Sequence, residues 1–152
     1  MVKMICFDMD GTIADLYRVD NWLGKLRAED ASAYTEAVAM WDMEELNNVL
    51  RALQNKGIEI RVITWLSKDS SEEFKIATRK AKRKWLEKVN FPFDKFHGVQ
   101  YGATKADSVR NSLASNETAV LIDDNDKVRN GWSLGKTINP ATENIIEALK
   151  KL

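Results

Sequence analysis

Two aspartates one residue apart follow the first apolar segment of the chain. Residues 2–7 are too few for a helix and are typical of a buried strand. A turn is expected next, at Asp8 to Gly11, because Asp and Gly leave strands readily. Asp8 could then attack a phosphorus atom, and Asp10 could exchange protons with the leaving group and with water. The same residues would also suit an ordinary turn.

Thr64 and Trp65 end the next predicted strand, residues 58–63. In an open α/β sheet, ligands bind beyond the carboxyl ends of the strands, so Thr64 would lie near Asp8 if the two strands were neighbours. Taken alone, Thr64 would also fit an ordinary strand.

Acidic residues cluster after the strand predicted over residues 118–122. Asp123, Asp124 and Asp126 would repel one another there unless a cation lay between them. Asp126 is interpreted as a solvated residue. Lys105 opens another predicted helix, where the helix dipole disfavours a cation, and this favours a functional role for it.

Strands and helices alternate along the rest of the chain. Helices are predicted to begin near Asp42, Ser70 or Ser71, Thr104 and Pro140, with further strands over residues 96–100 and 136–138. This alternation is typical of an α/β protein whose parallel strands are joined by right-handed crossovers. A chain of 152 residues is expected to form one domain.

Residues 14–42 form an insertion between the first strand and the next regular helix. Two short amphipathic helices are predicted there, over about residues 19–27 and 30–40. The insertion would either form a small lid over the site or pack on the edge of the sheet.

Composition and charge narrow the class of protein. Lys plus Arg and Asp plus Glu both number 23, which argues against a protein that coats nucleic acid non-specifically. No segment approaches the roughly 20 apolar residues of a membrane span, and no signal region is visible, so a soluble cytoplasmic protein is expected. The lone cysteine, Cys6, lies in a predicted core strand and is expected to be unreactive.

Basic residues crowd the long helix predicted to end near Val89. Its expected apolar stripe contains Phe74, Ala77, Ala81, Trp85 and Val89. The lysines and arginines of residues 75–88, Lys82 among them, are expected on its solvated faces. They could alternatively guide a nucleotide or a nucleic-acid end toward the site.

In their order and spacing, these residues resemble the four motifs of the haloacid dehalogenase superfamily of phosphohydrolases. Residues 8–12 resemble the first motif, Thr64 the second, Lys105 the third and residues 120–124 the fourth. The resemblance spans residues 2 to about 138. It implies a Rossmann-like, three-layer parallel sheet of strand order 5-4-1-2-3, with only a minimal helical cap in residues 14–42.

The resemblance also implies a Mg²⁺ site. The expected ligands are the Asp8 carboxylate, the Asp10 backbone carbonyl and the Asp124 carboxylate. Asp123 would be a further ligand or an outer neighbour. Mg²⁺ prefers such oxygen ligands and keeps several waters.

The same resemblance assigns roles around the transferred phosphate. Asp8 would be the nucleophile that forms an aspartyl-phosphate, and Asp10 the acid/base. Thr64 and the backbone amides of Met9 and Trp65 would hold phosphate oxygens. The Lys105 ammonium would pair with both the nucleophile and the phosphoryl group.

The expected activity is Mg²⁺-dependent hydrolysis of a phosphomonoester, with a nucleotide as the first candidate substrate. Residues 84–88, together with Lys105 and residues 121–124, are similar to the 5′-deoxyribonucleotidase branch. That branch carries a larger cap, which puts nucleotide specificity in doubt here. The alternatives are a phosphatase that processes nucleic-acid ends and a catalytically idle protein that binds a phosphorylated ligand. A pure binder would not need the acid/base at Asp10.

Overall fold

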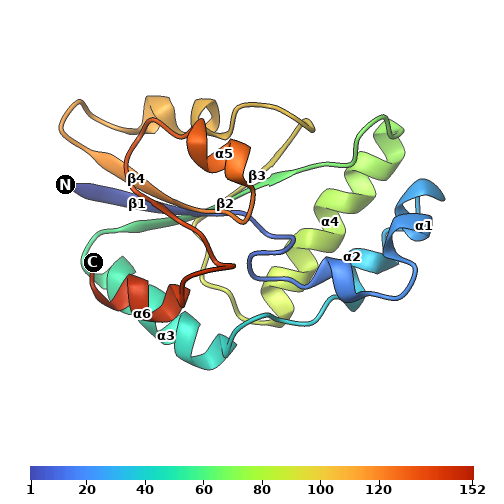
Figure 1. The fold of residues 1–152 in the computed structure, drawn as a ribbon, viewed down its shortest axis with the longest axis horizontal. Helices are drawn as coiled ribbons and strands as arrows, with labels where there is room; N and C mark the ends of the chain where they lie inside the picture. The colour runs from blue at the N-terminus through green and yellow to red at the C-terminus, as the bar shows by residue number, and fades with distance from the viewer.

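The computed structural model describes residues 1–152, and its centre is one five-stranded sheet (Figure 1). The strands are β1 (Val2–Phe7), β2 (Glu59–Trp65), β3 (Lys95–Val99), β4 (Thr118–Ile122) and β5 (Thr137–Ile138). Their order is β3-β2-β1-β4-β5, and every neighbouring pair is parallel. The predicted α/β class and strand order are therefore confirmed, with β1 between β2 and β4.

The strand β1 is apolar because both of its faces are covered. Met4, Ile5, Cys6 and Phe7 are fully buried, which is typical of a parallel sheet between two layers of helices. Burial raises the pKa of the Cys6 thiol to about 12, so this cysteine is a neutral core residue at physiological pH.

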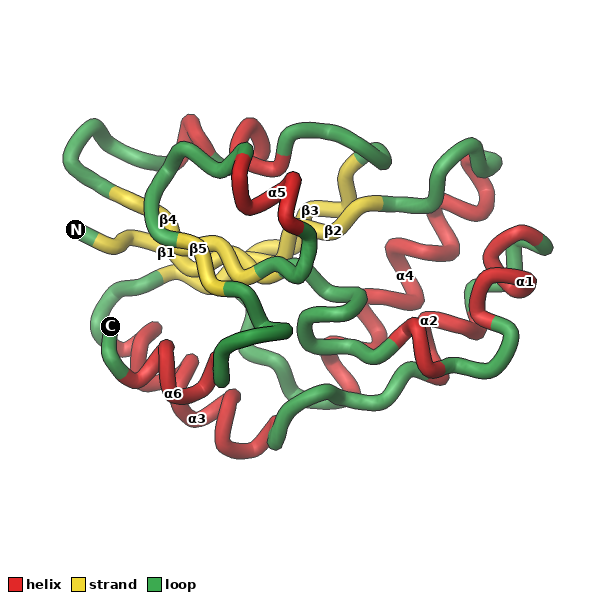
Figure 2. Tube along the Cα trace, in the orientation of Figure 1, coloured by secondary structure: helices red, strands yellow, loops and turns green.

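Helices and 3-10 turns cover both faces of the sheet and give the predicted three layers (Figure 2). They are α3 (Met43–Asn55), α4 (Glu72–Lys88), α5 (Asp126–Asn130), α6 (Ile145–Lys150), η2 (Lys105–Ser108) and η3 (Arg110–Ser112). On one face, α3, α4 and α6 pack against alternate strand residues such as Ile5 and Phe7. On the other face, η2 and the region of α5 cover Met4 and Cys6. None of the helices has the length and apolar character that crossing a bilayer requires.

Two helices begin at the predicted capping residues. At the start of α3, the Asp42 carboxylate accepts a hydrogen bond from the Glu45 backbone N–H at 3.1 Å. At the start of α4, Ser71 Oγ accepts one from the Phe74 N–H at 3.1 Å. Gly57 follows α3 with a φ of +89°, as expected for a glycine that ends a helix.

Two other helices differ from their predicted bounds. The segment from Lys105 to about Leu113 forms the two 3-10 turns η2 and η3, separated by Val109 at φ −126°. Its Asp, Ser and Asn side chains favour turns over a continuous α-helix. The C-terminal helix begins after Asn144 instead of at Pro140, because the Asn144 side chain accepts hydrogen bonds from two backbone N–H groups of α6.

The insertion packs against α4 and not on the edge of the sheet (Figure 1). It contains η1 (Leu16–Arg18), α1 (Trp22–Arg27) and α2 (Ser32–Glu36), so both of its helices are shorter than predicted. Asn21 and Glu29 flank α1 in the left-handed region, each at φ 55°. After α2, the Trp85 indole N–H of α4 donates to the Ala37 carbonyl at 2.7 Å, which fixes the returning segment.

Candidate active site

A cleft of about 660 Å³ opens at the carboxyl end of the sheet. The turn after β1, the ends of β2 and β4, η2 and the insertion all contribute to its lining. The predicted site residues in this lining are Asp8, Asp10, Thr64, Trp65, Lys105, Asp123 and Asp124. Met9 is the exception, because its side chain is buried in the core and only its backbone belongs to the turn.

The turn after β1 is tight and requires glycine. The Met9 carbonyl accepts hydrogen bonds from the backbone N–H groups of residues 12–14, at 3.0–3.1 Å. Gly11 has a φ of +79°, and a Cβ at this position would clash with the Asp124 carboxylate. The turn therefore brings the backbone of the first motif against the acid that follows β4.

Three backbone groups of this turn have no partner within the protein. Neither the N–H of Met9 nor the N–H of Asp10 donates a hydrogen bond, and the Asp10 carbonyl accepts none. Buried backbone groups are nearly always paired, so free ones at a cleft are suited to a ligand. The N–H groups could bind an anion, and the carbonyl could bind a cation.

Asp8 is held between a hydroxyl and an ammonium group. Thr12 Oγ1 donates to Asp8 Oδ2 at 2.9 Å, and Lys105 Nζ donates to Asp8 Oδ1 at 2.9 Å. Lys105 also donates to Asp123 Oδ2 at 2.8 Å. Burial alone would lower the pKa of Lys105, but the Asp8 and Asp123 carboxylates outweigh burial and raise it. Lys105 therefore stays charged between two acids.

Asp8, Asp123 and Asp124 form a group of carboxylates that could hold a metal ion. One oxygen from each lies within 4.8 Å of the others. Burial, and then the neighbouring Asp8, raises the pKa of Asp124 to about 7 and also raises that of Asp123. Concentrating these acids is unfavourable without a cation, and a divalent ion would relieve it. The oxygen donors, with the free Asp10 carbonyl, fit Mg²⁺.

Lys82 of α4 belongs to the site, and its predicted place on a solvated face is wrong. Its side chain is fully buried. Its Nζ donates to Asp10 Oδ2 at 2.9 Å and to Thr64 Oγ1 at 2.6 Å. A third bond, at 3.0 Å, goes to the Trp65 carbonyl. Lys82 thus ties the carboxylate of Asp10 to the end of β2.

The burial of Lys82 agrees with the helical spacing of its buried neighbours on α4. The stripe expected on α4 included Ala77, but Ala77 is exposed and Thr78 is buried in its place. Lys82 lies one turn after Thr78 and one turn before Leu86, and all three are fully buried. Helical spacing is therefore sufficient to place Lys82 on the buried face of α4, but it does not identify the residues of other segments that Lys82 contacts.

We expect Lys82→Met to lower the free energy of unfolding by about 3 kcal/mol, because it leaves the Asp10 carboxylate in the cleft without its cation. Urea unfolding would measure the change. Lys84→Met is the matched control, since Lys84 is an exposed residue of the same helix and should change stability by no more than about 0.5 kcal/mol. Equal stability of the two variants would show that Lys82 does not hold this carboxylate.

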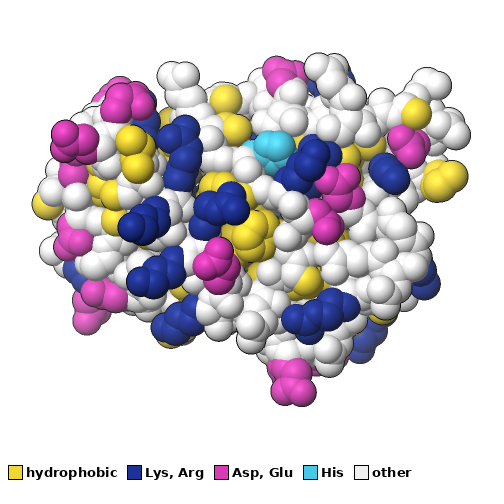
Figure 3. All heavy atoms as spheres, turned by 180° about the vertical axis from the view of Figure 1, so that it is seen from behind, with side chains coloured by type: hydrophobic (Ala, Val, Ile, Leu, Met, Phe, Trp, Pro, Cys, Tyr) yellow, Lys and Arg dark blue, Asp and Glu magenta, His cyan; other side chains and the backbone are white.

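The remaining basic residues of α4 do lie at the surface. The exposed ones are Arg79, Lys80, Arg83, Lys84 and Lys88. Figure 3 views the molecule from behind, and Lys and Arg side chains are prominent on this face, interspersed with acidic ones. The Arg83 guanidinium lies over the rings of Phe93 and Phe96, at 5.7 and 5.4 Å from their centroids. Most of this helix is therefore basic toward solvent, as predicted.

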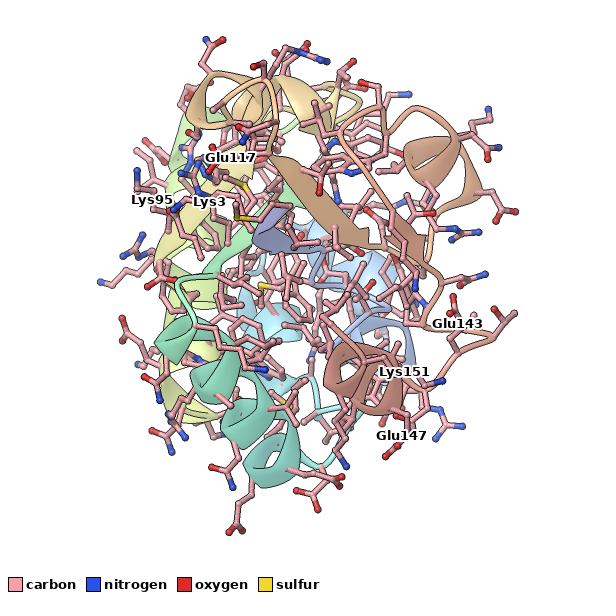
Figure 4. The ribbon with its side chains drawn as sticks, turned by 90° about the vertical axis from the view of Figure 1, so that its left-hand side faces the viewer. Lys3, Lys95, Glu117, Glu143, Glu147 and Lys151 are labelled. Atoms are coloured by element: carbon pink, nitrogen blue, oxygen red, sulfur yellow. The ribbon has the colours of Figure 1, made fainter.

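The opposite end of the sheet carries charges of both signs. Figure 4 views this end, and its labels mark Lys3, Lys95, Glu117, Glu143, Glu147 and Lys151. No group of three metal-ligating side chains occurs there, and the one such group in the structure is at the carboxyl end. The acid cluster is therefore a local feature of the cleft.

Comparisons with known proteins add evidence on the fold. No protein-family model matches the chain, and no curated protein matches its sequence. Among solved structures, it is similar to a chain in the structure of the Pnkp1/Rnl/Hen1 RNA repair complex, with a TM-score of 0.62 and 15% sequence identity. That match covers 91% of this chain but 42% of the other, so the present chain spans less than half of its length.

A second solved structure is a D,D-heptose 1,7-bisphosphate phosphatase from Burkholderia thailandensis. The TM-score is 0.50 and the identity 16%, over 88% of this chain and 74% of the other. At such low identities the two matches show a shared fold. The predicted fold is thus found in a phosphatase, and the chemistry of the present chain has to be argued from its own residues.

Proposed function

We propose that the protein is a Mg²⁺-dependent phosphomonoester hydrolase that acts through an aspartyl-phosphate on Asp8. The observation that carries the proposal is the position of Asp8, which lies beside an acid cluster, a buried lysine and the free N–H groups of Met9 and Asp10. A nucleophilic carboxylate needs its charge offset when a phosphate approaches, and Lys105 and a divalent cation would supply this.

Asp8, Asp124 and the Asp10 carbonyl are the proposed metal ligands. Asp123 is only 1% exposed, whereas Asp124 is half-buried, and the Asp123 oxygens accept from Lys105 at 2.8 Å and from the Asn125 backbone N–H at 2.9 Å. Asp124 lines the cleft, and its carboxylate forms no salt bridge with a lysine or arginine. Asp124 is therefore the more available ligand, and Asp123 orients Lys105. Bound Mg²⁺ would polarise the phosphoryl group and offset its charge.

The reaction divides into two transfers. In the first, an Asp8 carboxylate oxygen forms a bond to phosphorus as the bond to the leaving oxygen breaks, and that oxygen takes a proton from Asp10. In the second, water loses a proton to Asp10 and attacks phosphorus, which releases phosphate and restores Asp8. Burial raises the pKa of the Asp10 carboxyl, even though Lys82 opposes the shift, and a raised pKa suits a group that must carry a proton.

Lys82 and Thr64 complete the proposed machinery. The ammonium holds the Asp10 carboxylate on one side and the Thr64 hydroxyl on the other. Thr64 Oγ1 accepts this hydrogen bond, so its own hydroxyl hydrogen is free to donate to a phosphate oxygen. Lys82 is thus a positioning residue for both the acid/base and the phosphate-binding hydroxyl.

A nucleotide is the first proposed substrate. The end of a nucleic acid is the second candidate, and the exposed basic residues of α4 favour it. One solved structure similar in fold to this chain comes from an RNA repair complex. The insertion contributes only short helices to the lining of the cleft, which could therefore admit either ligand.

We expect phosphate release from nucleoside monophosphates, sugar phosphates or phosphorylated oligonucleotides, screened with Mg²⁺ present. Removing the metal with a chelator should lower turnover at least about tenfold, because the acids of the cleft would again repel the phosphate. Turnover should return when Mg²⁺ is added in excess. Undiminished turnover in metal-free buffer would overturn the proposed metal dependence.

A further inference from the structure

We infer that Trp65 and Tyr101 form a stacking platform for the nucleobase of the substrate, which rests on and refines the proposed hydrolase function. Their ring centroids lie 5.1 Å apart with the ring planes tilted by 52°. Both residues line the cleft that holds Asp8. The platform is distinct from the carboxylates and lysines that would act on the phosphate.

Trp65 is a fixed wall of the cleft. Its indole N–H donates to the Ala103 carbonyl at 2.9 Å, which ties the end of β2 to the loop after β3. Its backbone carbonyl accepts from Lys82, and Lys105 Nζ lies 5.5 Å from the centroid of its ring. The ring is therefore held next to the phosphate-binding residues, where it cannot turn away without breaking contacts.

Tyr101 presents its ring to solvent at the mouth of the cleft. It is 52% exposed and lies in the loop after β3, before Gly102 at φ +84°. Its hydroxyl forms no hydrogen bond within the protein, so no polar contact explains its place. In proteins that bind single-stranded nucleic acids, bases stack on aromatic side chains, and the exposed Tyr101 ring is available for such a contact.

The insertion supplies a second aromatic pair to the same cleft. Tyr17 and Trp22 meet edge to face, with centroids 5.0 Å apart. The cleft thus has a charged floor and aromatic walls from two separate parts of the chain. A small polar leaving group would leave these walls in contact with water, whereas a flat heterocycle would cover them.

Charged groups among the lining residues favour a nucleobase over a plain aryl ring. Arg27, Lys68 and Asp69 belong to this lining, so both donors and acceptors are available for the polar edge of a base. The shared chemistry is a nucleotide with a phosphomonoester, present either as a free mononucleotide or as the terminal residue of a strand.

The test is a substrate-selectivity ratio. For wild type and Tyr101→Ala, kcat/KM would be measured on adenosine monophosphate and on glycerol phosphate with Mg²⁺. We expect the ratio between the two substrates to fall roughly five- to hundredfold in Tyr101→Ala, mainly through KM for the nucleotide, because stacking acts equally on the ground and transition states. Tyr101→Phe keeps the ring and should keep the ratio. Ile76→Ala, an exposed apolar truncation on α4 outside the cleft, is the surface control.

An unchanged ratio in Tyr101→Ala, or an equal loss on both substrates, would overturn the platform. Binding measured by calorimetry tests the platform without requiring the proposed hydrolase activity. In an Asp8→Asn background, Tyr101→Ala should weaken binding of adenosine monophosphate by a similar factor but not binding of inorganic phosphate. If wild type hydrolyses no substrate, the hydrolase proposal fails while this comparison still decides the platform. Equal nucleotide binding with and without Tyr101→Ala would overturn it.

Short single-stranded oligonucleotides with a terminal phosphate form the second arm and identify the source of the nucleotide. Tighter binding of the oligonucleotide than of the mononucleotide, with a steep dependence on salt, would assign a strand end as the ligand. Equal binding of the two would assign the free nucleotide. In either case the platform requires that Tyr101→Ala weaken both ligands.

Discussion

Asp8→Asn is expected to lower turnover by roughly 10⁴–10⁶-fold on every substrate, the range seen when a covalent nucleophile is removed. The amide oxygen cannot form the phosphoenzyme, although the side chain keeps its size. The fold should survive, because Asn can still accept from Lys105 and its amide group can donate to Thr12 Oγ1. Thermal unfolding and steady-state kinetics would be measured together.

Asp126→Asn is the matched control for this variant. Asp126 lies two residues beyond Asp124, its side chain is 83% exposed, and it pairs with Arg129 outside the cleft. The same acid-to-amide change should therefore leave turnover at the wild-type level. Multiple turnover by Asp8→Asn near the wild-type rate would show that Asp8 is not the nucleophile.

Much of the sheet could be predicted from the sequence because β1 and β4 are short, largely apolar runs that end at polar residues. A parallel strand covered on both faces leaves this pattern without help from distant residues, as β1 shows with four fully buried positions. The capping residues Asp42 and Ser71 could be predicted for a similar reason, because each accepts a hydrogen bond from the backbone N–H only three residues later in the sequence. The order of the strands depends on contacts between segments that are distant in sequence, and its prediction came from the family resemblance.

The bounds of the short helices were less predictable because competing local signals are similar in strength. Pro140 fits the first position of a helix, but Asn139 closes a turn there by accepting from the Ala141 N–H at 3.0 Å. The side chain of Asn144 then caps α6, which begins at Ile145, five residues after Pro140. Tertiary packing therefore decides such boundaries when local signals compete.

Among the residues of the cleft, those at strand ends could be predicted from the sequence, whereas Lys82 of α4 could not. Asp8, Thr64 and Asp124 are adjacent because their strands are adjacent. Lys82 is different, since its burial depends on partners 18 and 72 residues away in sequence. Nothing in the neighbouring sequence distinguishes this lysine from the other basic residues of α4, apart from its helical spacing relative to the buried residues.

Two carboxylates of the first motif are thus paired with two different lysines. Asp8 is paired with Lys105 and Asp10 with Lys82, each at 2.9 Å. Burial raises the pKa of Asp10, and the hydrogen bonds of Lys82 go to Asp10, Thr64 and the Trp65 carbonyl and not to the acid cluster. The two carboxylates therefore lie in separate environments, and the raised pKa of Asp10 suits the proton-carrying role that the proposed reaction assigns to it.

Asp10→Asn tests this division directly. We expect it to cut turnover by roughly 10²–10⁴-fold, the usual contribution of a positioned general acid/base. Mg²⁺ affinity should be nearly unchanged, because the proposed ligand is the backbone carbonyl of Asp10, which remains. Lys82 would keep an amide oxygen, the Thr64 hydroxyl and the Trp65 carbonyl as acceptors, so the fold should persist with some loss of stability.

The choice of ester separates the two proton transfers. A p-nitrophenyl leaving group needs little protonation, so phosphoenzyme formation by Asp10→Asn should be slowed less with this ester than with an alkyl phosphate. Hydrolysis of the phosphoenzyme would still lack its base, and the intermediate should accumulate in single-turnover experiments. A catalytically idle binding protein would show no difference between wild type and Asp10→Asn on either ester. Loss of Mg²⁺ binding along with activity would instead make the Asp10 side chain a metal ligand, and the acid/base role would then have to belong to another residue of the cleft.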